Sequence, residues 1–138
     1  MKLSTANAIA GILSGMKINK FADKDVKNAL VADFIAMRKA LRAANDDAQE
    51  VIRKFQDDWR EELAPVDALR KEGKPVVGHD EYLDAEMDAN KAISGIFSAE
   101  VEIDLTPIKT DAFLAACGDD ELTLEQIAFL QENGILEE

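Results

Sequence analysis

Few side chains in this sequence are suited to catalysis. The chain has a single histidine, His79, and a single cysteine, Cys117, and Asp80 follows the histidine directly. Any triad of the Ser/His/Asp or Cys/His kind would have to pass its proton through His79. One imidazole and one thiol also cannot supply the three or four soft ligands of a zinc site. We therefore predict no catalytic residues, and interpret His79 as a surface residue at a helix start and Cys117 as a small buried hydrophobe.

Four oxygen-bearing side chains at alternate positions imitate part of a calcium-binding loop. The match fails because Ala89 stands where the sharp turn needs glycine and Gly95 where the bidentate glutamate belongs. The glycines also form no run that could cradle a phosphate. We therefore predict no metal, no cofactor and no small-molecule substrate. The four side chains are those of Asp84, Glu86, Asp88 and Asn90.

Charge is unevenly distributed along the chain, which has 138 residues and a net charge of −12. Residues 1–42 carry eight basic and three acidic side chains, whereas residues 70–138 carry five basic and seventeen acidic ones. Duplex DNA is a poor partner for the acidic half, so we expect no nucleic acid. The basic residues form a solvated face, a patch that docks onto the acidic half of a neighbouring copy or of another acidic protein, or, as the least favoured alternative, a contact with nucleic acid. They are Lys17, Lys20, Lys24, Lys27, Arg38, Lys39 and Arg42.

The N-terminal apolar stretch does not resemble a secretion signal. Asn7 and Ser14 interrupt it, and Lys17 and Lys20 follow it in place of a small-residue cleavage site. No window approaches 18 uninterrupted apolar residues, so we expect no membrane span. The sequence therefore favours a cytoplasmic protein with a reduced thiol.

Two helices are expected in the first half of the chain. Ser4 or Thr5 can cap a helix that ends near Lys17, and Asp23 can cap a second one that runs to the residue before Pro65. The only weak helix formers inside the second helix are residues 45–47; we favour an unbroken helix, and a break there is the alternative. Its apolar stripe, which we expect to carry the packing and association, consists of Val26, Leu30, Phe34, Met37, Leu41, Val51, Phe55 and Trp59.

The expected length of this helix determines how much of its apolar stripe the rest of the chain can cover. At 1.5 Å per residue it would measure roughly 60 Å. A compact globule of this chain length has a diameter under about 40 Å. The sequence therefore predicts an elongated arrangement whose apolar stripe extends beyond what its own chain covers, and the remainder is a candidate surface for self-association.

The second half is expected to add smaller elements. After a connection over residues 64–79, a third helix occupies 80–97, and 100–105 alternates acidic and aliphatic residues as a half-buried strand does. Thr110 to about Cys117 should form a short helix, and Thr123 with Gln126 forms a capping box that starts the last one. We predict one mainly α domain over 1–138: a helical hairpin (1–63), the connection, the third helix, and a strand region with short helices (98–138) that includes a minor two-stranded β element.

The order of these parts resembles that of small proteins encoded by tailed bacteriophages and prophages. The resemblance rests on the long helix from Asp23 to Trp59, the segment Glu100–Leu105 with Thr106-Pro107-Ile108, and the closing Leu-Thr-Leu-Glu-Gln segment. It implies a setting in the cytoplasm of a bacterial host, or in association with a virion, and a role in virion morphogenesis. That family has no assigned activity, so the resemblance supplies no functional residues.

From these features we expect a non-catalytic structural or assembly accessory protein. It would act through helix-mediated association, as a homo-oligomer or with another phage or host protein. The alternative is an acidic regulatory binder that occupies a basic surface of a host or phage protein, as an inhibitor or nucleic-acid mimic would. Ionic strength distinguishes the two, because a complex held by carboxylates weakens with salt and an apolar helix interface persists.

Overall fold

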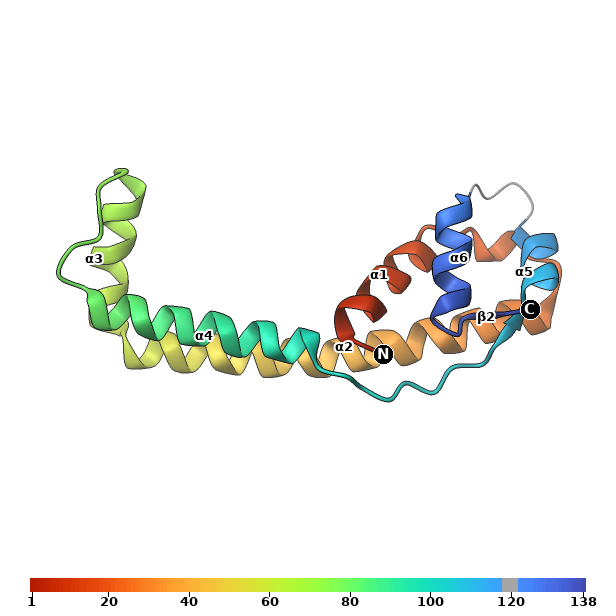
Figure 1. Cartoon of the computed structure of the whole chain (residues 1–138), viewed down its shortest axis with the longest axis horizontal. Helices are drawn as coiled ribbons and strands as arrows, with labels where there is room; N and C mark the ends of the chain where they lie inside the picture. The colour runs from red at the N-terminus through yellow and green to blue at the C-terminus, as the bar shows by residue number, and fades with distance from the viewer. Residues whose placement is uncertain (118–121) are drawn as a thin grey trace. The chain divides into compact units, whose positions relative to one another are not determined.

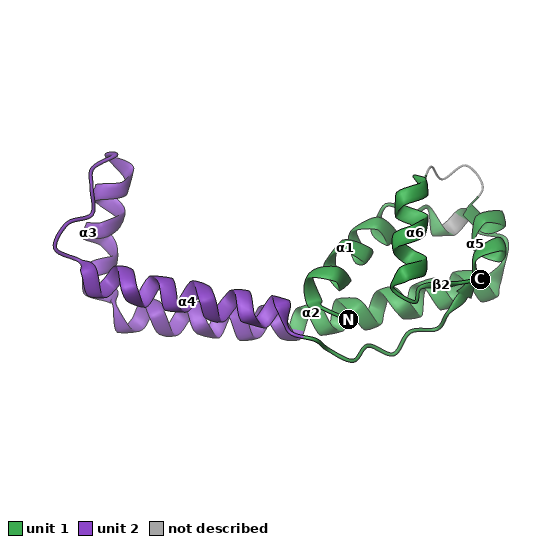
Figure 2. Cartoon of the chain, viewed as in Figure 1, with its two compact units in different colours: residues 1–42, 100–138 green, residues 43–99 purple. Residues whose placement is uncertain are grey.

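The computed structural model describes residues 1–117 and 122–138 (Figure 1). Within this part, the chain forms six α-helices, one short 3-10 helix and a two-stranded sheet, which confirms a mainly helical fold with a minor β element. Contacts divide the chain into two compact units: unit 1 comprises residues 1–42 and 100–138, and unit 2 comprises residues 43–99 (Figure 2). The sequence predicts a single domain, whereas the helices of residues 43–99 form contacts of their own around Tyr82.

Unit 1 begins with a helical hairpin. Helix α1 (Leu3–Ser14) leads through a 3-10 turn, η1 (Ile18–Lys20), to helix α2 (Lys24–Asp58). Asp23 caps α2 as expected, because its Oδ1 accepts the backbone N–H groups of Asp25 at 2.9 Å and Val26 at 3.2 Å. Helix α1 has no side-chain cap and ends at Ser14. The predicted cap at Ser4 or Thr5 and the predicted end near Lys17 are therefore wrong.

Helix α2 is continuous through residues 45–47, as favoured, but it does not reach Pro65. It ends at Asp58, Trp59 leaves the helical conformation (φ −119°, ψ 24°), and helix α3 (Arg60–Lys71) begins at once. Pro65 lies inside α3. A proline removes the hydrogen bond to the carbonyl four residues before it, here Glu61, and both residues are exposed so that water can replace that bond. The predicted hairpin boundary at 63 and the predicted connection over 64–79 are therefore wrong up to Lys71.

Unit 2 combines residues 43–58 of α2 with α3 and helix α4 (Asp80–Ser98), which lies beside α2 in Figure 2. Tyr82, in the first turn of α4, is buried in this unit. The Phe55 ring lies 5.2 Å from the Tyr82 ring, and the Trp59 ring meets Tyr82 edge-on at 6.0 Å. The break between α2 and α3 at Trp59 therefore coincides with a cluster of three aromatic rings that packs the end of α2 against α4.

The remainder of unit 1 comes from the last forty residues. Strands β1 (Ile108–Lys109) and β2 (Leu136–Glu137) pair in parallel, with Ile108 opposite Leu136. Helices α5 (Thr110–Cys117) and α6 (Leu124–Glu132) lie between them in sequence. The α6 capping box is present: the Thr123 Oγ1 accepts the Gln126 N–H at 3.1 Å, and the Gln126 Oε1 accepts the Thr123 N–H at 2.9 Å.

The predicted strand over 100–105 is wrong. Its aliphatic residues are half-buried and its acidic residues are exposed, so the alternation does distinguish a partly buried side of the segment from an exposed side. No strand runs beside it in the described part of the chain; it makes an isolated bridge between Lys2 and Glu100 and a bond from Val101 N–H to the Met1 carbonyl at 2.9 Å. Period-two alternation records which side is buried, and a strand also requires a hydrogen-bonded neighbour.

The core of unit 1 gathers side chains from both segments of the unit. Residues of α1 and of the first part of α2 meet residues of β1, α5, α6 and β2 in one buried cluster. Burial of such apolar surface is the main stabilising contribution to a domain of this size. The cluster includes Ile9, Leu13, Val26, Leu30, Met37, Ile108, Phe113, Leu130, Ile135 and Leu136.

Candidate functional site

The structure places the predicted apolar stripe largely under other parts of the chain. Val26, Leu30 and Met37 belong to the unit 1 core, and Leu41 is also buried. Phe34 is half-buried and packs against that core. These side chains pack within unit 1, so a surface for association with another protein must lie elsewhere on α2.

The stripe residues of unit 2 have a similar position. Val51, Phe55 and Trp59 are half-buried, and the two aromatic rings contact Tyr82. Their packing role is therefore visible within unit 2 itself.

An apolar hollow opens at the end of the α1–α2 hairpin in unit 1. It has a volume of about 260 Å³, and its walls come from the end of α1, the η1 turn and one side of α2. A hollow of this size and lining can receive a few apolar side chains of a partner, as in helix-in-groove recognition. It is lined by Leu13, Ser14, Met16, Ile18, Leu30, Val31 and Phe34.

Beside the hollow, α2 exposes two large aliphatic side chains. Val31 is 38% exposed and Ile35 is 58% exposed. At 3.6 residues per turn they share one face with basic residues that recur every three or four positions, within an arc of about 80°. We call this the mixed face of α2; it comprises Lys24, Lys27, Val31, Ile35, Arg38 and Arg42.

The mixed face is joined to the hollow by a cation–π contact. The Arg38 guanidinium lies over the Phe34 ring, 5.9 Å from its centroid, and Phe34 lines the hollow. The sequence identified these basic residues as a patch but did not associate them with Val31 and Ile35, because the apolar stripe was traced along the core side of the helix. The helical spacing of the residues from Lys24 to Arg42 could have shown that Val31 and Ile35 share a face with the basic residues.

A second feature that the sequence reading missed is a carboxylate in the core. Asp33 is 0% exposed and lies between Leu30 and Met37 on the buried side of α2. Its Oδ1 accepts the backbone N–H of Thr106 at 2.6 Å, and its Oδ2 has no hydrogen-bond partner. Burial raises the pKa of Asp33 from 3.8 to about 6, and the bond from Thr106 opposes that rise.

The spacing of Asp33 could have identified it. It stands three residues after Leu30 and four before Met37, which places it on the buried face more centrally than Phe34. A single carboxylate on the apolar side of a helix is a feature that commonly fixes register or acts as a switch. Here it connects α2 to the segment that leads into β1.

The single histidine takes part in packing between α3 and the start of α4 in unit 2, beside a second ion pair that joins these helices. The His79 Nδ1 lies 2.9 Å from the Glu62 Oε2, and Arg70 forms a bidentate pair with Glu86 at 2.7 and 2.9 Å. The Arg70 guanidinium lowers the pKa of the Glu86 carboxyl. These contacts join the two helices, so each side chain has a structural role in the unit.

The four side chains that resemble part of a calcium-binding loop are not arranged as a metal site. Its residues lie within α4, where alternate positions do not converge, and Glu86 is already paired with Arg70. Over residues 1–117 and 122–138, no group of three or more histidine, cysteine or acidic side chains is placed to hold a metal ion. Cys117 is buried at the end of α5.

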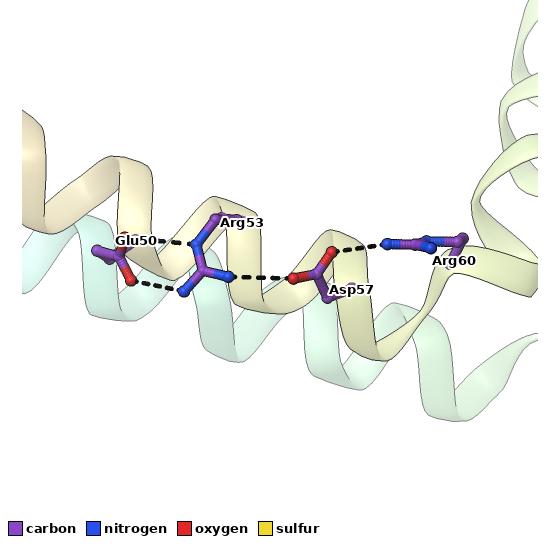
Figure 3. A network of polar contacts seen from close by, with 4 residues as sticks. All are labelled: Glu50, Arg53, Asp57 and Arg60. Carbon is purple, nitrogen blue, oxygen red and sulfur yellow. Dashed lines mark hydrogen bonds and ion pairs between the residues drawn. The ribbon is translucent and has the colours of Figure 1, made fainter.

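A network of ion pairs runs along the exposed side of α2 in unit 2 (Figure 3). Arg53 bonds Glu50 at 2.8 Å and Asp57 at 3.2 Å, and Asp57 also pairs with Arg60 at 3.0 Å. Exposed ion pairs at this helical spacing contribute little to stability, because solvent screens them. The network supports the end of α2.

Comparison with known proteins yields no relative: no family model, no curated protein and no solved structure matches the chain. In the part of the chain that the structure describes, no helix is long and apolar enough to cross a membrane.

Proposed function

We propose that this protein is a non-catalytic structural or assembly accessory protein that works through helix-mediated protein–protein association. The observation that carries the proposal is the mixed face of α2: Val31 and Ile35 are exposed directly beside an apolar hollow, with basic side chains around them. Apolar anchors within a polar rim are the usual composition of a protein interface. The hollow would seat the anchors of a partner helix.

The setting we propose comes from the resemblance alone. Small proteins of tailed bacteriophages share the order of parts described above, which supports a role in virion morphogenesis inside a bacterial host. The partner is then another copy of the chain or another phage or host protein.

An acidic regulatory binder is the second candidate function. The observation in its favour is the outer side of α4, where Asp80, Glu81, Asp84 and Asp88 are all exposed. Such a surface would occupy a basic site on another protein, and raising salt from about 50 mM to about 500 mM would dissociate that complex. Association through the mixed face should retain part of its affinity at high salt, because Val31 and Ile35 contribute apolar area.

Site-specific photo-crosslinking tests the main proposal. A photoreactive phenylalanine analogue replaces Ile35 in the full chain, which is produced in the cells that normally make it. The matched control carries the analogue at Val77, which is 76% exposed in the loop before α4. We expect a discrete protein adduct at position 35 that is absent at position 77 and is lost when Arg38 is changed to Glu.

Two results would contradict the proposal. Equal labelling at positions 35 and 77 would show that Ile35 is merely exposed. An adduct that persists unchanged in the Arg38→Glu background would show that the mixed face does not select its partner.

A further inference from the structure

We propose that the partner of the mixed face is the acidic face of α4 in a second copy of this chain, packed antiparallel to α2. This inference rests on the proposed association function and names the occupant of that surface. It is carried by charge, exposure and helical spacing in the two faces.

The outer side of α4 has the complementary composition. Met87 is 57% exposed, and the acidic residues around it are also exposed. At 3.6 residues per turn these positions lie on the side of α4 opposite the buried Tyr82. We call this the acidic face of α4; it comprises Asp80, Glu81, Asp84, Met87 and Asp88.

Each face therefore has an exposed apolar side chain with charges mainly of one sign beside it. On α2 the centre is Val31 with Ile35 and the charges are positive; on α4 the centre is Met87 and the charges are negative. Lys91 is the one basic residue near Met87 on α4, and it also borders a shallow hollow there. Opposite charges around apolar anchors favour encounter and orientation of two surfaces.

The spacing of the two faces selects one direction of packing. On α2, Arg38 follows Ile35 by three residues and Arg42 follows Arg38 by four. On α4, Asp84 precedes Met87 by three residues and Asp80 precedes Asp84 by four. An antiparallel pair of helices therefore sets these residues opposite one another with equal rise along the axis.

In this register Met87 faces Ile35, Asp84 faces Arg38 and Asp80 faces Arg42. Lys91 then lies beside Val31, one turn or about 6 Å along the axis from Lys27, so no like charges face each other directly. Parallel packing with Met87 at Ile35 would place Lys91 beside Arg38, which is unfavourable. Antiparallel helices also align their macrodipoles favourably.

The contact is heterologous, because α2 of one copy meets α4 of the next. An open assembly therefore has one unused mixed face at one end and one unused acidic face at the other, unless it closes into a ring. Assembly of this kind grows with protein concentration.

Exchanging the charges tests the inference. One variant carries Arg38→Glu and Arg42→Glu, and the other carries Asp80→Lys and Asp84→Lys. In each variant alone the paired positions 38/84 and 42/80 carry the same sign, whereas in an equimolar mixture both kinds of contact between opposite signs are restored at these positions. Sedimentation velocity over a wide range of concentration is the measurement, and circular dichroism confirms that each variant is folded.

We expect the wild-type chain to sediment faster as concentration rises and each variant alone to remain monomeric, with an apparent dissociation constant raised about tenfold or more. The mixture should recover the wild-type behaviour. A control with Lys39→Glu and Lys54→Glu has the same change in net charge on α2 outside the mixed face, and should associate as the wild type does.

Three outcomes would overturn the inference: a wild-type chain that stays monomeric throughout, variants that associate like the wild type, or a mixture that stays monomeric. The crosslink at Ile35 separates these failures from failure of the proposed function. An adduct with a different protein would leave the association function standing with another partner. No adduct above the Val77 control would remove the function as well.

Discussion

Asp33 and Thr106 connect two segments of unit 1 that are far apart in sequence. The Asp33 Oδ1 accepts the Thr106 N–H at 2.6 Å, while the second carboxylate oxygen is buried without a partner. One backbone hydrogen bond does not offset the loss of hydration of an ionised carboxylate, and burial accordingly raises its pKa to about 6. Asp33 therefore ties the segment before β1 to α2, and the free-energy cost of burying its carboxyl group depends on pH.

Replacing Asp33 should change the pH dependence of stability. Between pH 3.8 and about 6 the folded chain keeps a proton that the unfolded chain has released, so the free energy of unfolding falls as pH rises through this window. Above it the ionised side chain costs about 3 kcal/mol. In Asp33→Asn the amide oxygen can still accept the Thr106 N–H and this slope should disappear. Urea unfolding at several pH values from about 4 to 8 measures the difference.

Asp46→Asn is the matched control, because Asp46 is an exposed carboxylate on the same helix. The stability difference between Asp33→Asn and the wild type should shift in favour of the variant by about 3 kcal/mol from low to high pH, offset by a constant cost of about 1–3 kcal/mol for the buried amide N–H₂. A pH-independent difference would show that Asp33 is ionised in the folded chain at no cost.

Neighbouring residues of α2 should separate stability from association. Leu30 is in the unit 1 core, so Leu30→Ala should reduce the free energy of unfolding by about 2–5 kcal/mol. Ile35 is 58% exposed, and Ile35→Ala should change stability by less than about 0.5 kcal/mol while weakening association. Thermal unfolding and sedimentation of both variants provide the comparison. A large loss of stability in Ile35→Ala would place that side chain in the core.

Tyr82 should be the residue on which unit 2 depends most. It is buried and contacts both Phe55 and Trp59, so Tyr82→Ala should cost about 3–5 kcal/mol. Hydrogen exchange should then lose protection chiefly over residues 43–99. Tyr82→Phe keeps the ring contacts and should retain most of that protection. Uniform loss over the whole chain in Tyr82→Ala would show that the two units unfold together.

Two glycines of unit 1 should respond in opposite directions to the same change. Gly134 follows α6 with φ of +80°, so Gly134→Ala forces a strained backbone and should destabilise by about 1 kcal/mol. Gly11 is inside α1 with open space where a Cβ would lie, and Gly11→Ala should stabilise by about 0.5–1 kcal/mol. Thermal unfolding measures both. Stabilisation in both variants would mean that the turn after α6 does not need the positive φ.

Local signals in the sequence proved sufficient for several helix boundaries. The Asp23 cap and the capping box at Thr123 and Gln126 follow from short-range rules, and the structure confirms them. The third helix begins at Asp80 as expected, but His79 takes the N-cap position and no side chain caps the helix. Each of these features depends on residues within one or two turns, so the information is contained in the segment itself.

Features that depend on distant residues could not be predicted in the same way. The strand pair joins Ile108 to Leu136, and nothing in either two-residue segment identifies the other. The end of α2 coincides with the Trp59–Tyr82 ring contact, a contact between distant residues, whereas the local signal pointed to Pro65, which lies inside α3. The mixed face was missed because exposure of Val31 and Ile35 is decided by which side of α2 the rest of unit 1 covers.

The order of segments in unit 1 also has a consequence for biosynthesis. Its core and its β-pair need residues 108–137 together with residues 1–42, and the whole of unit 2 is translated between them. On the ribosome, the apolar side of the α1–α2 hairpin must therefore stay uncovered until residues 108–137 have been translated. Chaperones that bind nascent chains would be expected to engage this hairpin rather than unit 2, whose contacts are all made within residues that emerge consecutively.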